Sequence, residues 1–238
     1  MAISSGRLGI GIIGAGRVGP VLGAALAGAG HAIVGIASVS EGNRDRARAM
    51  LPDVAILEIP LLLERSELVI LAIPEAQIES LVAGLAATGS WQPGQLVLHT
   101  APGVGYTVLA SAVAAGVIPL AIHPAMVFTG TSLDLVRMRE SYFAVTAPTP
   151  VLPIGQALVV EMGGEPIIIA EHDRAAYADA VSTAASFSAS IVRQSTGMLA
   201  ELGIESPANV LGPLLRSSVE TALQAAGGDS DLLRGMPQ

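Results

Sequence analysis

A glycine-rich segment near the N-terminus has the residue spacing of a phosphate-binding turn. It follows the apolar run Leu8–Ile13 and opens residues 18–29, a stretch of small residues typical of a helix. The first glycine would permit a tight turn, the second would let the backbone approach a pyrophosphate, and the third would let the helix pack closely on the strand. The helix N-terminus would offer free N–H groups to phosphates. The spacing therefore predicts a dinucleotide site, although a structural turn without a ligand is the alternative. The segment consists of Gly14, Ala15, Gly16, Arg17, Val18 and Gly19.

Hydroxyl and arginine side chains lie where a ribose-binding acid would be expected, about 20 residues after the loop. The chain has Ser38-Val39-Ser40 there, and Asn43, Arg44 and Arg46 follow. Hydroxyl and guanidinium groups donate to phosphate oxygens, so this segment favours the 2'-phosphate of NADP, with NAD as the other possible cofactor. Alternatively, Arg44 and Arg46 belong to a solvated helix face and Glu41 binds the ribose.

Further candidates follow three apolar runs, at the carboxyl edge where doubly wound sheets bind ligands. Ile73-Pro74 and Thr100 are expected to contact the cofactor, Thr100 at its nicotinamide end, although Pro74 equally fits a simple strand end. His123 could donate a proton or hold the substrate carbonyl, or it could bond only a loop carbonyl.

The other histidines fit less active roles. His99 is expected to be structural, and His31 and His172 are expected to be exposed.

A later stretch carries polar side chains at helical spacing. Tyr177, Asp179, Ser182 and Ser186 lie near the predicted end of the sheet domain. Tyr177 could donate a proton, and Ser182 and Ser186 could bind a substrate carboxylate. An amphipathic helix with a seam of small residues gives the same pattern.

Composition excludes several classes of function. The net charge is -8, there is no cysteine, and all twelve basic residues are arginine. Clustered basic residues are needed for nucleic acids and anionic membranes, so neither partner is expected. Disulfides, cysteine-bound metals and lysine chemistry are excluded, and we expect no metal site.

The charge-free run Val104–Ile122 is interrupted by glycine and proline, so it is read as a loop, a helix and a strand and not as a membrane span. We expect a cytoplasmic protein with a retained N-terminus.

Alternating apolar runs and helical patterns predict an α/β fold with a doubly wound, Rossmann-type parallel sheet. Residues 1–170 would form this dinucleotide-binding domain, and residues 171–238 a small all-helical domain for substrate binding and dimerisation. The expected strands are Leu8–Ile13, Ala32–Val39, Leu68–Ile73, Gln95–Leu98, Ile118–Ile122, Tyr142–Thr146 and Pro166–Ala170. The expected helices are Val18–Ala29, Glu41–Leu51, Glu75–Leu85, Val104–Ala115, Leu152–Met162, Asp173–Leu202 and Pro207–Ala225.

Five segments make the chain similar to a known family. It resembles the predicted oxidoreductases that join a Rossmann-like domain to a helical domain of unknown function, in the 6-phosphogluconate dehydrogenase-like and pyrroline-5-carboxylate reductase-like group. The matching segments are Ile12–Gly19, Ala72–Ile78, His99–Pro102, His123–Phe128 and Asn209–Leu223. The chain has Tyr177-Ala178 where the family tends to carry Tyr-His, and Ala185-Ser186 where it tends to carry Ser-Asn. It also lacks the lysine of the better-known reductases.

The resemblance implies NAD(P)-dependent reduction of a small carbonyl or imine, often by a homodimer. The missing lysine favours an imine, because an iminium already carries the charge that attracts hydride. A dinucleotide-binding sensor or partner protein without turnover is the alternative function, and a Rossmann-like module without a ligand is a third.

Overall fold

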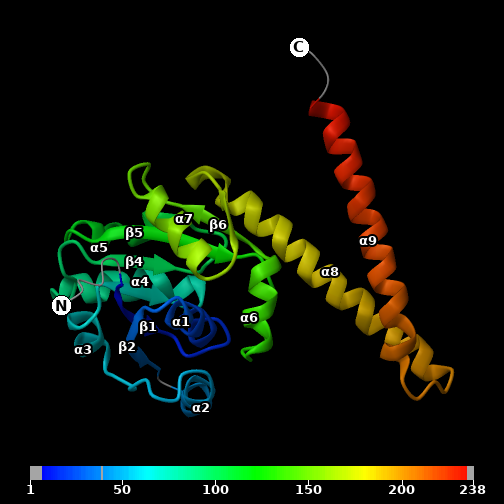
Figure 1. The fold of residues 1–238 in the computed structure, drawn as a ribbon, viewed down its shortest axis with the longest axis horizontal. Coiled ribbons are helices and arrows are strands. Elements are labelled where there is room, and N and C mark those ends of the chain that lie inside the picture. Colours follow the sequence, from blue (N-terminus) through cyan, green and yellow to red (C-terminus); the bar gives the residue numbers. More distant parts are fainter. Residues whose placement is uncertain (1–6, 39, 235–238) are drawn as a thin grey trace. The chain divides into compact units, whose positions relative to one another are not determined.

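A seven-stranded sheet organises the first part of the chain (Figure 1). A computed structural model describes residues 7–38 and 40–234, so Val39, the predicted end of the second strand, lies outside the described residues. The strand order is β2-β1-β3-β4-β5-β6-β7. The strands are β1 (Gly9–Ile13), β2 (Ala32–Ala37), β3 (Leu68–Leu71), β4 (Leu96–His99), β5 (Ile118–Pro124), β6 (Tyr142–Thr146) and β7 (Glu165–Ile168). The predicted α/β fold is confirmed.

One strand departs from the parallel arrangement. The pairs β2-β1, β1-β3, β3-β4 and β4-β5 are parallel, whereas β6 runs antiparallel to β5, with His123 opposite Ala144. β7 is then parallel to β6. The prediction that the last two strands extend the sheet is right, and the sheet is parallel as predicted except at the antiparallel β5–β6 pair. The segment between β5 and β6 holds only short helical turns and makes no full crossover, so the chain returns in the opposite direction.

The helices agree with the sequence pattern where they are long. They are α1 (Gly19–Gly28), α2 (Glu41–Met50), α3 (Ile59–Glu64), α4 (Glu75–Ala87), α5 (Ala110–Val113), α6 (Leu133–Arg137), α7 (Leu152–Glu161), α8 (Arg174–Glu201) and α9 (Pro207–Arg234). The predicted helix Val104–Ala115 is instead a 3-10 turn, Tyr106–Leu109, followed by the single turn of α5. Sequence reasoning missed α3 and α6, which are too short to show a periodic face. It also ended α9 too early, because this helix continues to Arg234.

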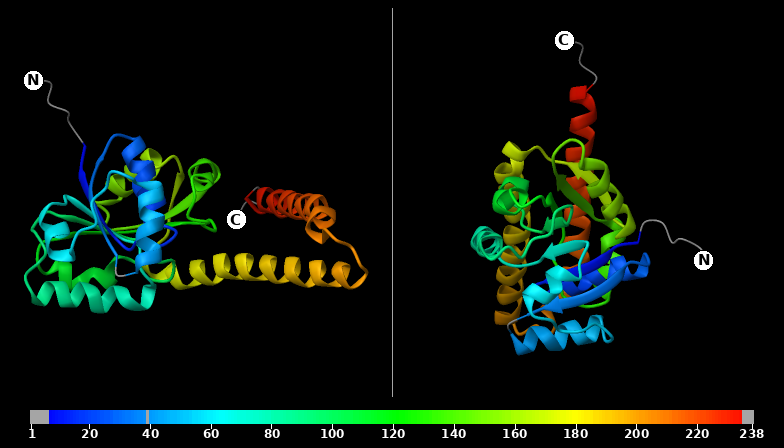
Figure 2. Two further views of the ribbon diagram at one scale, coloured as in Figure 1. Left: turned by 90° about the horizontal axis from the view of Figure 1, so that it is seen from below. Right: turned by 90° about the vertical axis from the view of Figure 1, so that its left-hand side faces the viewer.

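Side chains alternate along the strands to build two cores, one on each face of the sheet. Leu68 and Ile70 of β3 pack into one core with α1 and α7. Val69 and Leu71 pack into the other core with α3, α4 and α5. Figure 2 shows helices on both sides of the sheet. A strand buried on both faces has to be apolar throughout, which explains the uninterrupted run in the sequence.

Two buried side chains bind the backbone of distant segments. His31 is buried, its Nδ1 accepts from the N–H of Leu8 at 3.0 Å, and its Nε2 lies 2.9 Å from Oε2 of Glu161. The prediction that His31 is exposed is therefore wrong, because α7 covers the turn that carries it; His172 is exposed, as predicted. Trp91, the single tryptophan of the chain, is also buried and donates its indole N–H to the carbonyl of Val82 in α4 at 3.2 Å.

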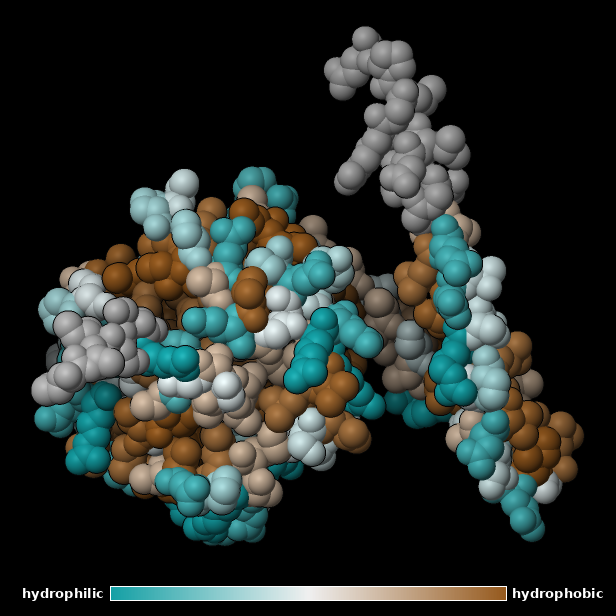
Figure 3. Space-filling view, viewed as in Figure 1, coloured by the Kyte–Doolittle hydropathy of each residue, from teal (hydrophilic) through white to brown (hydrophobic). Residues whose placement is uncertain are grey.

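The chain divides into two compact units between Val181 and Ser182, within α8. The first unit contains the sheet, its helices and the first turns of α8. We predicted the domain boundary near Ala170, which precedes α8 in the sequence. In the second unit, none of the described side chains from Ser182 to Ala226 is buried, and apolar side chains cover much of its surface (Figure 3). Within residues 7–38 and 40–234, no helix has the length and apolarity needed to cross a membrane.

Candidate functional site

The glycine loop connects β1 to α1 and has the geometry of a phosphate cradle. Gly14 has a φ of +109°, and its N–H donates to the carbonyl of Ala37 at 3.0 Å. A Cβ on Gly14 would lie 2.2 Å from the carbonyl oxygen of Ala72, and a Cβ on Gly19 would lie 2.2 Å from that of Gly14. A Cβ on Gly16, by contrast, would meet no atom within 4 Å. Gly14 and Gly19 are thus required by the fold itself, whereas Gly16 leaves open space at the turn.

A cavity of about 800 Å³ lies against this loop, entirely within the first unit. Eight of the predicted cofactor residues line it, namely Gly14, Ala15, Gly16, Ser38, Asn43, Arg44, Ile73 and Pro74. Five others do not, namely Arg17, Val18, Gly19, Ser40 and Thr100. The segment from the end of α2 to the start of α3 and the first turns of α4 complete the wall with residues that sequence reasoning missed. These are Ile56, Leu57, Glu58, Ile59, Gln77, Ser80 and Leu81, together with Ile13, Ala37 and Ala72.

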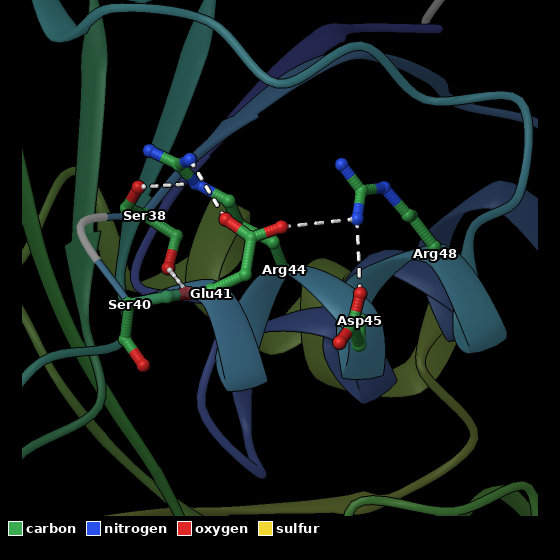
Figure 4. Close-up of polar contacts among 6 residues, drawn as sticks. All are labelled: Ser38, Ser40, Glu41, Arg44, Asp45 and Arg48. Atoms are coloured by element: carbon green, nitrogen blue, oxygen red, sulfur yellow. Dashed lines mark hydrogen bonds and ion pairs between the residues drawn. The ribbon is translucent and has the colours of Figure 1, made fainter.

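Arg44 is held at the rim of the cavity, where it faces the end of β2 (Figure 4). Its Nε donates to the carbonyl oxygen of Ser38 at 3.1 Å, and its Nη1 lies 3.1 Å from Oε2 of Glu41. The side chain is 35% exposed, so part of its guanidinium is free to bind another anion. The other oxygen of Glu41 pairs with Arg48 at 3.4 Å, which keeps this carboxylate beside Arg44.

Two residues close to Arg44 in the sequence, Ser40 and Arg46, do not line the cavity. Ser40 precedes α2, but its side chain does not cap that helix. Its carbonyl accepts instead from the N–H of Arg44 at 3.0 Å and from the hydroxyl of Ser38 at 3.3 Å. Arg46 points elsewhere and donates to Oδ1 of Asn43 at 2.9 Å. Of the two arginines, only Arg44 lines the cavity.

His123 and Tyr177 come together although they are far apart in the sequence. His123 lies at the carboxyl end of β5, and Tyr177 lies in the first turns of α8. Nδ1 of His123 is 2.9 Å from the hydroxyl of Tyr177, and the two rings meet edge to face with centroids 5.6 Å apart. Burial lowers the pKa of His123 to about 4, with a smaller contribution from the charge of Arg174. Burial also raises the pKa of Tyr177. At neutral pH the pair is therefore a neutral imidazole bonded to a protonated phenol.

His99 and Thr100 lie at the end of β4. His99 is 0% exposed, its Nε2 lies 2.9 Å from the carbonyl oxygen of Gly105, and its Nδ1 accepts from the N–H of Ala101 at 3.3 Å. Both ring nitrogens are thus used within the loop, which agrees with a structural role. The N–H of Thr100 donates to the carbonyl of Leu71 at 3.3 Å and ties the loop to β3.

Sequence reasoning did not single out two charged residues at this edge of the sheet, Glu171 and Arg174. Glu171 accepts from the N–H groups of Tyr106 and Thr107, both at 3.1 Å, and so joins the segment before α8 to the loop after β4. Arg174, in the first turn of α8, is 1% exposed. The sequence feature that could have pointed to Arg174 is its position one helical turn before Tyr177, which places both side chains on the same face of α8.

The two candidate serines belong to the second unit. The hydroxyl of Ser186 donates to the carbonyl of Ser182 at 2.7 Å, a bond within α8 itself. Asp179 is exposed. Substrate binding by Ser182 and Ser186 stays a prediction. Among the described residues, no group of three or more His, Asp and Glu side chains could hold a metal ion.

Known structures share this fold at low sequence identity. A Bacteroides fragilis protein assigned as an NADP oxidoreductase matches with a TM-score of 0.73 and 18% identity, over 90% of this chain and 80% of its own. A Streptomyces aurantiacus imine reductase gives 0.71 and 12%, over 95% and 78%. A pyrroline-5-carboxylate reductase from Coxiella burnetii gives 0.66 and 15%, over 98% and 86%. No curated protein matches the sequence.

Two sequence families cover most of the chain. Residues 1–124 match the Rossmann-like domain, and residues 141–233 match a domain of unknown function, DUF2520. The first match contains the glycine loop, the cavity and His123, and the second contains Tyr177. The chain therefore belongs to the Rossmann-like domain family and carries a helical C-terminal domain of the DUF2520 type, as its resemblance to predicted oxidoreductases implied.

Proposed function

We propose that this protein is an NADP-dependent reductase that reduces a C=N or C=O bond of a small metabolite. The observation that carries the proposal is the arrangement of the carboxyl edge of the sheet. The glycine loop and its cavity lie after β1, and the His123–Tyr177 pair lies at the carboxyl end of β5 of the same sheet. Such an edge is where doubly wound folds bind dinucleotides and their substrates.

The residues of the cavity fit the parts of a dinucleotide. The open side of Gly16 leaves room for a pyrophosphate to approach the backbone at the N-terminus of α1. The part of the Arg44 guanidinium that Ser38 and Glu41 leave exposed can bind the 2'-phosphate, which supports NADP over NAD. When bound, the nicotinamide ring supplies the hydride.

The His123–Tyr177 pair orients the substrate and is a poor source of protons. The lowered pKa of His123 leaves the imidazole uncharged at neutral pH, and the raised pKa of Tyr177 makes its phenol a weaker acid. Their mutual hydrogen bond uses one of the two hydrogens, so the pair still offers one donor and one acceptor to the reducible group, and the acceptor can bind the N–H of an iminium. This chemistry suits a C=N bond, because an iminium has already received its proton from solvent, whereas a ketone needs a strong acid as its oxygen gains charge.

The exposed surface of the second unit supports a homodimer. Large apolar side chains remain exposed on α8 and α9, among them Phe187, Ile191, Met198, Leu214 and Leu223. An apolar surface of this kind is costly in water and marks an interaction site, and we propose a second copy of the chain as its partner. Light scattering after gel filtration should give twice the mass of one chain, and a monomer at micromolar concentration would refute the dimer.

Calorimetric titration of the full chain with NADPH and NADH tests the cofactor assignment. NADPH should bind more tightly than NADH. Oxidation of bound NADPH should then be followed with 2-methyl-1-pyrroline and cyclopentanone, a cyclic imine and a ketone of similar size. Faster oxidation with the imine supports the proposal. Tight binding with no oxidation by any imine or ketone would favour the alternative of a dinucleotide sensor, and no binding of either cofactor would refute both functions.

A further inference from the structure

A buried arginine in the first turn of α8 lacks the partners that a buried charge requires. Arg174 is 1% exposed, and Nε, Nη1 and Nη2 have no hydrogen-bond acceptor among the residues that the structure describes. Buried ionic groups are normally paired, because a guanidinium loses its hydration when it leaves water. The exception therefore needs an explanation.

The acidic residues nearest to this guanidinium are engaged elsewhere. Glu171 accepts from the backbone of Tyr106 and Thr107, and Glu75 accepts from the N–H of Gly103 at 2.9 Å. Both carboxylates influence the charge of Arg174 through space, but neither forms an ion pair with it among the described residues. They secure the loop after β4 and leave all five N–H donors of Arg174 unused.

Packing against an aromatic ring does not account for the buried charge. The guanidinium carbon lies 6.0 Å from the centre of the Tyr177 ring, at the outer limit of a cation–π contact. Such a contact satisfies no N–H group. If the role of Arg174 were only to fill space, an uncharged side chain of similar length would do so without the cost of burying a charge.

The position of Arg174 associates it with the reactive pair. Tyr177 lies one turn further along the same helix and holds His123 through a 2.9 Å hydrogen bond. The positive charge of Arg174 also acts on both His123 and His99. The guanidinium thus belongs to the same buried cluster, at the carboxyl ends of β4 and β5.

We propose that Arg174 binds a carboxylate of the substrate, so that this protein acts on small imino or oxo acids. The inference rests on the proposed function, because it assigns a substrate class to that same site. A carboxylate matches the planar fork of a guanidinium and can accept two parallel hydrogen bonds from it. It would also neutralise the buried charge, which makes the cluster most stable when the anion is present.

Anion binding to the full chain in the presence of NADPH tests the inference. The probes are oxamate and its uncharged counterpart oxamide, with pyruvate and benzoate as further carboxylates of different size and inorganic phosphate as a second oxyanion. We expect carboxylates to bind in calorimetry and to raise the melting temperature, whereas oxamide has no effect. Binding of phosphate with no response to any carboxylate would overturn the assignment.

Variants separate a binding role from a structural one. Arg174→Met keeps the length of the side chain and removes the charge, and Arg139→Met is the matched control at an exposed arginine. Arg174→Met should weaken carboxylate binding by about tenfold or more, leave NADPH affinity unchanged within about twofold, and raise the melting temperature of the free protein. A lower melting temperature with undiminished carboxylate binding would show that Arg174 is structural. Arg174→Lys keeps the charge without the fork and should retain only part of the affinity.

The two proposals fail in different ways. If NADPH is oxidised by an uncharged imine and no carboxylate binds, the reductase assignment stands and the role of Arg174 is wrong. If carboxylates bind through Arg174 and NADPH does not bind, the anion site stands and the reductase assignment is wrong.

Discussion

Replacement of Arg44 by alanine should weaken NADPH binding and leave NADH binding nearly unchanged. A charge-assisted hydrogen bond between a guanidinium and a phosphate contributes about 1.5 to 3 kcal/mol when it is well shielded. At Arg44 the lower end applies, because the side chain is 35% exposed and Glu41 lies 3.1 Å from its Nη1. We therefore expect about a tenfold rise in the Kd for NADPH, equivalent to about 1.4 kcal/mol, and a change below about twofold for NADH.

Arg48 provides the matched control for this experiment. It lies one turn after Arg44 on α2 and pairs with the same carboxylate, Glu41, at 3.4 Å and also with Asp45 at 2.9 Å, but it does not line the cavity (Figure 4). Arg48→Ala should change the Kd for NADPH by less than about twofold. Both variants are measured by calorimetry at low and physiological salt. Equal losses for NADPH and NADH in Arg44→Ala, or equal losses of NADPH in the two variants, would refute a 2'-phosphate contact at Arg44.

Four further variants address the glycine loop, the reactive pair and the buried His99. Gly16→Ala should keep the melting temperature of the wild type, because its Cβ would meet no atom within 4 Å, and should weaken NADPH binding by about tenfold or more. Gly14→Ala should instead lower the free energy of unfolding by more than about 2 kcal/mol, since its φ of +109° and the carbonyl 2.2 Å from the added carbon both oppose a side chain; equal stability of the two variants in urea would contradict this distinction. Tyr177→Phe should lower kcat for imine reduction by about 10- to 100-fold with the Kd for NADPH unchanged, and an unaltered kcat would remove Tyr177 from the site. Burial lowers the pKa of both His99 and His123 from 6.5 to about 4, so the stability that their neutral forms allow is complete above pH 6.5 and is lost as the pH falls toward 4; urea unfolding at pH 7 and pH 5 should show a loss of about 4 kcal/mol, of which His99→Gln removes about half, and an undiminished loss in that variant would assign the effect to other groups.

The sequence predicted those parts of the fold that depend on local spacing. The apolar strands and the glycine loop have their period and their turn residues within one short segment. The direction of β6 and the existence of α6 are different, because they depend on how residues 125–141 cross the end of the sheet. The burial of His31 likewise depends on α7, whose Glu161 is far away in the sequence.

The same distinction applies to the candidate site. Ser38 and Arg44 were recognisable from their distance to the loop, and both line the cavity. Arg174 was not recognisable, because an arginine in a polar stretch is normally solvated and only the folded chain shows that it is buried. The contact between His123 and Tyr177 also needed the fold, although each residue had been proposed separately for proton transfer.

The single tryptophan gives this protein a built-in optical probe for its cofactor. The indole of Trp91 is bonded to the carbonyl of Val82, the residue after Leu81 in the wall of the cavity. Indole emission overlaps the absorption of a reduced nicotinamide, so NADPH in this cavity should quench it by energy transfer, whereas the oxidised cofactor should not. Trp91 belongs to the first unit, so its emission on heating reports the melting of the sheet alone. Cofactor binding, its oxidation and the stability of the sheet can all be followed in the unlabelled chain.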